Sequence, residues 1–240
     1  ASDIWYTALI SVFSAAQFIG SAWFGSLSDT FGRKKILIWS QAGTLLSWIL
    51  FGSAYFFNQE YLGITFLPLL VIGISRITDG LTGGNASVAS AYLADITTPK
   101  ERSTVHGYIG GAFGLAMIIG PGIGGFSASF SIGYLGTAIA AGIISAITLL
   151  ALIFGLKESL VEADRVSLKK FSLWKQIKIW EKIRQISNQK FVQKIFSING
   201  VFAFTMSAYS AVSALYIIDE FKLNTQELSY FFFATGAFLF

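Results

Sequence analysis

The sequence predicts an all-α integral membrane protein in which several helices cross the bilayer as a partial bundle. The first reason is composition: 54% of the residues are hydrophobic and 12% are charged, whereas about 25% are charged in an average soluble domain. The second is a mean hydropathy of +0.64. The third is that the few charged residues gather between long apolar runs. One water-soluble core could not bury this much apolar surface.

The first three spans follow from the apolar runs in the first part of the chain. A bilayer core about 30 Å thick accommodates about 20 helical residues, whose backbone groups bond within the helix. Two runs without a charged residue predict spans at 4–28 and 36–57. A third span is expected at 63–93, where Arg76 and Asp79 interrupt an apolar run.

The remaining spans lie on either side of a long basic stretch. Residues 103–156 contain no formally charged side chain, and a short polar turn divides them into spans at 103–126 and 132–156. A sixth span is expected at 191–218, and a seventh begins near 225. About six complete transmembrane helices and the start of another are therefore predicted, and we expect the chain to be a fragment of a longer protein.

The cations predict the orientation of these spans. The loops at 29–35 and 94–102 and the stretch at 157–194 carry most of the lysine and arginine, while the alternate loops at 58–62 and 127–132 carry none. Basic loops stay in the cytoplasm, so the chain is expected to begin on the outer side. If the complete protein keeps its N-terminus in the cytoplasm, one further span precedes this chain.

The longest basic stretch predicts a division into two bundles. Residues 1–156 form the expected N-terminal transmembrane bundle, 157–190 a cytoplasmic linker, and 191–240 the start of a second bundle. Within the linker, residues 168–186 place apolar and basic side chains on opposite sides of a helical wheel. This pattern indicates either a helix on the membrane surface or a solvated linker.

Several classes of site are not expected. The chain has no cysteine and one histidine, so we expect no disulfide, no metal site and no cofactor. The sequence shows neither a nucleophile with its base nor a pair of carboxylates, so an enzyme is not expected. The net charge of +4 reflects membrane topology, so no nucleic acid partner is expected. We expect a monomer whose partners are lipid, protons and a small molecule.

The polar stretch GSLSDTFGRKK, at residues 25–35, is expected to form a tight cytoplasmic turn between two antiparallel spans. Gly25 permits close helix packing, and Gly32 allows a tight backbone turn. Asp29 can cap a helix or form an ion pair, and Arg33 is a forked donor for a carboxylate. These properties alone predict a stable helical hairpin.

The spacing Gly25-x-x-x-Asp29-x-x-Gly32-Arg33 also resembles the signature loop of the major facilitator superfamily, between its second and third transmembrane helices. The resemblance implies a major facilitator-type helix bundle. In that superfamily the loop acts as a latch between conformations, which implies that Asp29 and Arg33 pair within a set that includes Asp95. The alternative is that these charges only stabilise the turn.

Further stretches resemble the same superfamily in the expected order. Arg76-x-x-x-Gly80 resembles its fourth-helix motif, and GAFGLAMIIGPGIGG, at 111–125, resembles its fifth-helix antiporter motif. YLADITTPKERS, at 92–103, and GLKESL, at 155–160, resemble drug/proton antiporters of the tetracycline-efflux type. The resemblance covers nearly the whole chain.

The fifth-helix motif contains Gly120, Pro121, Gly124 and Gly125. The string from Gly120 to Gly125 formally matches the dinucleotide fingerprint G-x-G-x-x-G, but that fingerprint needs a preceding strand. Proline removes a helical hydrogen bond, so a bend is expected, and glycines offer small faces for close helix packing. The resemblance implies that the bend also shapes a central cavity and limits leak.

Arg76 and Asp79 are the charged residues expected well inside a span. A charge near the bilayer centre costs about 2.5–3.5 kcal/mol, so these side chains need a reason. Either they neutralise one another at positions i and i+3, or they face a water-filled cavity where Asp79 carries a proton. Related sequences usually have an uncharged residue in place of Asp79. Gln17 and Asn199 are weaker candidates for the cavity wall.

The resemblance therefore implies a secondary transporter that exports a small amphiphilic compound in exchange for protons by alternating access. A nutrient uniporter or symporter of the same fold is one alternative. A membrane receptor or scaffold without transport activity is another. The expected location is the plasma membrane, with the basic loops in the cytoplasm.

Overall fold

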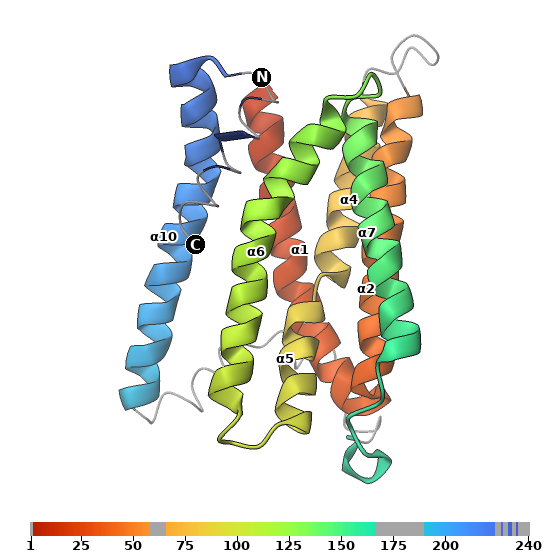
Figure 1. The fold of residues 1–240 in the computed structure, drawn as a ribbon, viewed down its shortest axis with the longest axis vertical. Coiled ribbons are helices and arrows are strands. Elements are labelled where there is room, and N and C mark those ends of the chain that lie inside the picture. The colour runs from red at the N-terminus through yellow and green to blue at the C-terminus, as the bar shows by residue number, and fades with distance from the viewer. Residues whose placement is uncertain are drawn as a thin grey trace.

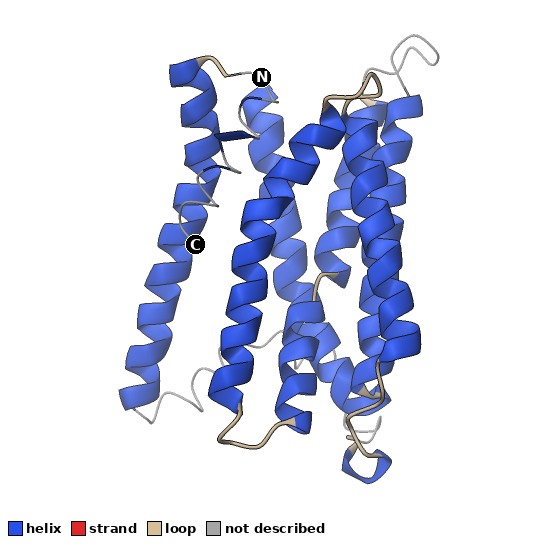
Figure 2. Ribbon diagram, viewed as in Figure 1, coloured by secondary structure: helices blue, strands red, loops and turns tan. Residues whose placement is uncertain are grey.

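The computed structural model describes residues 2–57, 66–166 and 190–223, together with residues 227, 230, 231 and 234. Every regular element in this described part is helical (Figures 1 and 2). The α-helices are α1 (Ser2–Phe31), α2 (Arg33–Ser53), α4 (Leu67–Thr82), α5 (Asn85–Ile96), α6 (Arg102–Ala128), α7 (Tyr134–Gly155) and α10 (Lys190–Phe221). Two short 3-10 turns are η1 (Ala54–Phe56) and η2 (Glu162–Asp164).

Four segments of the described part are long and apolar enough to cross a membrane. They are Ala8–Phe31, Arg33–Phe56, Arg102–Ala128 and Tyr134–Gly155. Their outward surfaces carry large apolar side chains such as Phe113, which is 62% exposed, and Phe154, which is 82% exposed. Such a surface is stable against lipid chains, so the protein is an integral membrane protein with several spans.

Two glycines determine where helices begin. Gly32 and Gly133 have φ of 97° and 54°, backbone conformations that glycine adopts freely and residues with a Cβ rarely adopt. Helix α2 starts directly after the first and α7 directly after the second. The role expected for Gly32 in a tight turn is confirmed.

The span expected at 63–93 is not an uninterrupted helix in the structure, which describes this segment from residue 66. Helix α4 ends at Thr82, α5 begins at Asn85, and Gly83 and Gly84 separate them (Figure 1). The glycines allow the chain to pack closely here, since a Cβ on Gly84 would lie 2.8 Å from the carbonyl oxygen of Gly20. The break falls in the stretch TDGLTGGNAS, at residues 78–87, where glycines can mark either close packing or a helix end, so the sequence did not distinguish the two.

Small residues and hydroxyl groups hold the bundle together. Helix α1 packs mainly on α4, and α2 lies against both α4 and α7. The hydroxyl of Ser75 donates to the carbonyl oxygen of Ser47 at 2.8 Å, and the amide of Gln41 donates to the hydroxyl of Ser145 at 2.8 Å. Membrane helices associate through such contacts because lipid supplies no hydrophobic driving force between them.

A small apolar core lies at the basic end of the bundle, where α1 meets α2. Ile36, Leu37 and Val88 are buried there. They are surrounded by side chains from α1, α5 and the end of α7: Phe24, Leu27, Phe31, Ala89, Tyr92, Leu152 and Leu156. This core fixes the helix ends that carry the polar cluster described next.

Some predicted features lie outside the described residues. These are the loop at 58–62, the linker segment at 168–186 and most of the seventh span. The division into two bundles therefore stays a prediction.

Candidate functional site

Arg33 organises a polar cluster at the basic end of the bundle. Its Nη1 lies 2.6 Å from Asp29 Oδ1, and its Nε lies 3.0 Å from Asp95 Oδ2. Nη1 also donates to the hydroxyl of Ser28 at 2.6 Å. The Arg33 side chain is 10% exposed, so a forked guanidinium is directed at two carboxylates with little water around it. The predicted contact among Asp29, Arg33 and Asp95 is confirmed.

The cluster includes a segment that the sequence analysis did not assign to it. Residues 156–166, which we call the strap, run from the end of α7 across the basic end of the bundle. Glu158 Oε1 accepts a hydrogen bond from the backbone N–H of Arg33 at 2.8 Å. Ser159 donates to Asp95 Oδ2 at 3.0 Å, and the N–H of Val166 donates to the carbonyl oxygen of Asp29 at 2.9 Å.

Gly25 does not have the packing role that its position in the motif predicted. A Cβ added there would have its nearest neighbour at the hydroxyl of Ser87, 3.5 Å away, which is an ordinary contact. The close helix approach lies instead at Gly80, where a Cβ would be 2.7 Å from Cβ of Ala16. The glycine of the fourth-helix motif therefore sits where α1 and α4 touch.

A second polar group lies inside the bundle, on α4. Arg76 Nη1 and Asp79 Oδ2 are 3.5 Å apart, and their side chains are 20% and 14% exposed. The two side chains therefore form an ion pair at positions i and i+3, as the first of the two expectations for them describes. The hydroxyls of Thr44 and Ser47, on α2, lie near the Asp79 carboxylate.

Two aromatic rings of α2 also contact Arg76. Its guanidinium carbon lies 5.1 Å from the ring centres of both Trp48 and Phe51. Aromatic faces attract cations, so the rings compensate part of the lost hydration. This contact was not expected from the sequence. Its signal is weak, since two aromatic residues three positions apart on an apolar helix usually face lipid.

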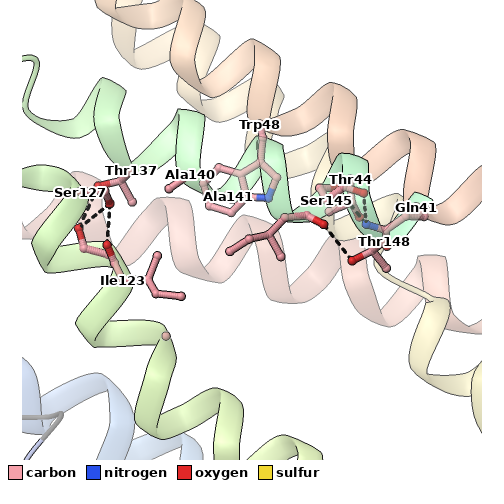
Figure 3. Close-up of a pocket in the computed structure, with 13 residues that line it drawn as sticks. Gln41, Thr44, Trp48, Ile123, Ser127, Thr137, Ala140, Ala141, Ser145 and Thr148 are labelled. Atoms are coloured by element: carbon pink, nitrogen blue, oxygen red, sulfur yellow. Dashed lines mark hydrogen bonds between the residues drawn. The ribbon is translucent and has the colours of Figure 1, made fainter. Parts of the chain in front are cut away.

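A pocket of about 410 Å³ opens between α2, α6 and α7 (Figure 3). Gln41, Thr44, Trp48, Ser145 and Thr148 line one part of it, and the remaining wall consists of Gly120, Ile123, Gly124, Ser127, Thr137, Ala140, Ala141 and Ile144. The lining is mostly apolar with a few hydroxyl and amide groups, as is common for small-molecule sites. Thr44 and Trp48 belong both to the pocket and to the surroundings of the charged pair.

The predicted bend of α6 fits the structure. The upper part of α6 leans toward α7 in Figure 1, and Pro121 lies inside this helix. The hydroxyl of Thr137, on α7, donates to the carbonyl oxygen of Gly124 at 3.2 Å. Gly125 is buried. However, a Cβ on Gly120 or Gly124 would meet no atom of the described residues within 4 Å, so close packing at these two glycines is not observed.

The remaining candidates lie apart from the charged pair. Gln17, on α1, is exposed, and its Nε2 would lie 3.4 Å from a Cβ on Gly83, at the break between α4 and α5. Asn199 belongs to α10, but its side chain lies outside what the structure describes. Neither residue is joined to Arg76 or Asp79 by a contact in the described part of the chain.

Comparisons with known proteins place this geometry in context. The sequence model of the Major Facilitator Superfamily matches residues 3–240. The chain is 34% identical over 229 residues to Multidrug resistance protein 2 of Bacillus subtilis (strain 168), which covers 92% of this chain and 51% of that protein. It is 33% identical over 123 residues to the class B Tetracycline resistance protein of Escherichia coli, which covers 51% of this chain and 28% of that protein.

The fold also has a counterpart among solved structures. The crystal structure of the human organic anion transporter MFSD10 (TETRAN) superposes with a TM-score of 0.72 at 21% identity, covering 97% of this chain and 54% of that one. At this identity the likeness shows the fold alone. The chain spans about half the length of the Bacillus relative and of this transporter.

Proposed function

The chain belongs to the major facilitator superfamily, and from that premise we propose that it is part of a proton-coupled antiporter that exports a small amphiphilic compound by alternating access. Members of this family are transporters and in general not enzymes. The relatives named for multidrug and tetracycline resistance support an exported, drug-like substrate. We place the protein in the plasma membrane, with the basic end of the bundle in the cytoplasm.

The observation that carries the proposal is the pair of charges on α4. An antiporter needs a carboxylate whose affinity for protons changes with the conformation of the protein. Asp79 is bordered by Arg76 at 3.5 Å and by the hydroxyls of Thr44 and Ser47. In the proposed cycle, a conformation that moves Arg76 away from Asp79 lets the carboxylate take up a proton.

Water must reach Asp79 for a proton to be exchanged. The pocket between α2, α6 and α7 begins at Thr44 and Trp48, and Trp48 is one of the rings beside Arg76. In the proposed cycle the pocket is the route by which water approaches the pair, and Gln17 and Asn199 belong to the cavity wall farther away. The bend at Gly120, Pro121, Gly124 and Gly125 shapes the opposite side of that route.

The cluster at the basic end acts in the proposal as a conformational latch, which we define as Asp29, Arg33 and Asp95 together with the two motif glycines, Gly25 in α1 and Gly32 in the turn. The contacts of Arg33 with two carboxylates stabilise one arrangement of the helix ends. Exposed ion pairs contribute about 0–1 kcal/mol, and Asp29 is about half exposed. A difference of this size is enough to shift two conformations of nearly equal free energy.

The proposal is tested by replacing Asp79 with asparagine in the complete protein, reconstituted in proteoliposomes with tetracycline and, separately, a lipophilic cationic dye as probes. The Asp79→Asn variant is expected to lose uphill transport driven by a proton gradient and to retain exchange of probe across the membrane. Glu101→Gln, at an exposed carboxylate before α6, is the matched control and is expected to retain both activities.

Uphill transport at the wild-type rate by Asp79→Asn would remove Asp79 from coupling and leave it as a structural partner of Arg76. Transport of either probe without any associated proton movement would instead favour a uniporter. Failure of the wild-type protein to move any probe would favour a receptor or scaffold.

A further inference from the structure

Helix α2 receives its N-terminal cap from a distant part of the chain. Its own N-cap residue is Gly32, which has no side chain, and its first turn contains no acidic residue. Glu158 Oε1 accepts a hydrogen bond from the N–H of Arg33 at 2.8 Å, and the same oxygen accepts from the N–H groups of Ser159 and Leu160 at 3.1 Å. A carboxylate at this end of a helix satisfies a free N–H and interacts favourably with the helix dipole.

The contact is reciprocal between α2 and α7. Lys34, in the first turn of α2, donates from Nζ to the carbonyl oxygen of Ile153 at 2.8 Å, and Ile153 lies in the last turn of α7. A negative group therefore lies at the start of α2 and a positive group at the end of α7, the two placements that helix dipoles favour.

Gly32 leaves the space that Glu158 occupies. A Cβ on Gly32 would collide with Oε2 of Glu158 and would lie 2.8 Å from its Cδ. The backbone of Gly32 also has φ of 97°. Glycine at this position thus serves the turn and the approach of the carboxylate at the same time.

The strap connects this cap to the latch. Ser159, the residue after Glu158, donates to Asp95 Oδ2, and the same oxygen accepts from Nε of Arg33. Arg33 is therefore held through its backbone by Glu158 and through its side chain by a carboxylate that Ser159 also contacts. A shift of the strap changes both contacts.

From this arrangement we propose that Glu158 is a positioning residue of the latch, which fixes Arg33 at the start of α2 and transmits movements of the strap to Arg33, Asp29 and Asp95. The inference rests on the proposed function, because it assumes that the latch biases alternating access. Glu158 touches neither the charged pair on α4 nor the pocket between α2, α6 and α7. Its effect on transport acts through Arg33.

Hydrogen exchange of the complete protein tests the positioning directly and needs no substrate. In Glu158→Ala the amide of Arg33 is expected to exchange about tenfold faster, because a hydrogen bond to a charged acceptor is lost. The control is Glu162→Gln, in the same strap, where the side chain is 88% exposed and lies 3.4 Å from Arg165. Exchange at Arg33 should be unchanged in the control. Equal exchange in Glu158→Ala and wild type would overturn the inference.

Transport rates distinguish a positioning role of Glu158 in the latch from a role as a helix cap alone. With tetracycline as probe, Glu158→Ala is expected to lower the maximal rate about tenfold while the half-saturating concentration changes by less than about twofold. Glu158→Gln keeps an acceptor oxygen for the N–H groups and should show an intermediate rate. A normal maximal rate in Glu158→Ala, together with faster exchange at Arg33, would make Glu158 a structural cap only and overturn the inference.

The same experiments distinguish the inference from the proposed function. Gly32→Ala should also lower the rate, through the strained turn as well as through the contact with Glu158. Because the two changes share that contact, the loss in the double variant should be smaller than the two single losses combined. Additive losses would overturn the inference. If wild type transports no probe, the proposed function fails, and the exchange rate of Arg33 still decides whether Glu158 positions this residue.

Discussion

Arg76 shows how a cation is accommodated inside a span. It has Asp79 at 3.5 Å on its own helix and two aromatic rings on α2, while its Nε is buried without a hydrogen-bond partner among the described residues. The flat guanidinium suits this environment because it can lie over rings and point toward a carboxylate at once. A lysine would offer only a single ammonium group.

We expect Arg76→Lys to lower the stability of the protein although the charge is kept. The contacts with Trp48 and Phe51 contribute about 0.5–2 kcal/mol each where they are shielded from water. Thermal unfolding in detergent measures the loss, with Arg102→Lys, at an exposed arginine, as the control. Equal midpoints for Arg76→Lys and wild type would show that the rings contribute nothing.

The latch makes a separate prediction at the residue scale. Asp29→Asn removes the charge that lies 2.6 Å from Arg33 Nη1 and keeps the shape of the side chain. Transport should slow while the equilibrium affinity for the substrate stays within a few-fold, because the change acts on the balance between conformations. Rates and binding are compared on protein of equal expression. A transport rate equal to wild type would remove the latch role.

The sequence could predict some of these residues and not others. Asp29 and Arg33 were predicted because a spaced motif contains them, and Asp95 was added because the family resemblance implies that they pair with a charge on a neighbouring helix. The role of Glu158 was not predicted because its partner is a backbone N–H. Every residue except proline has this group, so the sequence does not indicate which one is bound. The contact of Trp48 and Phe51 with Arg76 was not predicted because an aromatic residue on an apolar helix can face lipid or protein equally well.

At the scale of elements, glycines decide how closely the helices approach. Gly80→Ala is expected to destabilise the bundle by about 1–3 kcal/mol, the usual cost of overpacking, because the new Cβ would lie 2.7 Å from Cβ of Ala16. Gly25→Ala, with its nearest neighbour at 3.5 Å, is the matched control and should fold normally. Thermal midpoints of the two variants provide the comparison, and equal midpoints would contradict the assigned contact between α1 and α4.

The start of α6 gives a prediction about pH. Thr98 donates to Glu101 Oε2 from its backbone N–H at 2.9 Å and from its hydroxyl at 2.7 Å. These bonds favour the charged carboxylate, so the pKa of Glu101 lies below its ordinary value. The bonds therefore stabilise the turn above the ordinary glutamate pKa, and this contribution is lost as pH falls through the lowered value.

Replacing Thr98 with valine should raise the pKa of Glu101 toward its ordinary value, because the hydroxyl donor is lost. A carbon-13 NMR titration of labelled glutamate side chains measures the change. The carbon-13 signal of Glu162, whose side chain is 88% exposed, serves as the internal reference. An unchanged titration of Glu101 would show that the hydroxyl of Thr98 does not stabilise its charge.

Element boundaries were predicted where charge or backbone geometry marks them. The start of α2 was predicted from the polar stretch around Gly32, and the turn before α7 lies near its expected place. The break at Gly83 and Gly84 was not predicted, since two glycines within an apolar span usually mark packing and not a helix end. Here the backbones of α1 and α5 approach so closely that a side chain at Gly84 would collide with the backbone of Gly20.

For the whole molecule, the positions of exposed residues at the two ends of α6 test the orientation. Lys100 and Ser129 flank this helix and are exposed, and the sequence contains no cysteine. In sealed cells, a single cysteine in place of Ser129 should react with an impermeant reagent from outside. One in place of Lys100 should react only after the membrane is opened. The reverse pattern would overturn the orientation and the cytoplasmic location of the latch.

The break between α4 and α5 also constrains how the protein is assembled in the membrane. Irregular backbone is unstable in contact with lipid unless other protein covers its polar groups. Gly20 of α1 lies against the break, and the hydroxyl of Ser40, on α2, donates to the carbonyl oxygen of Thr82 at the end of α4. The residues that shelter the break are therefore made before it during synthesis. The segment formed by α4 and α5 can therefore enter the lipid only where α1 and α2 already provide a covering surface.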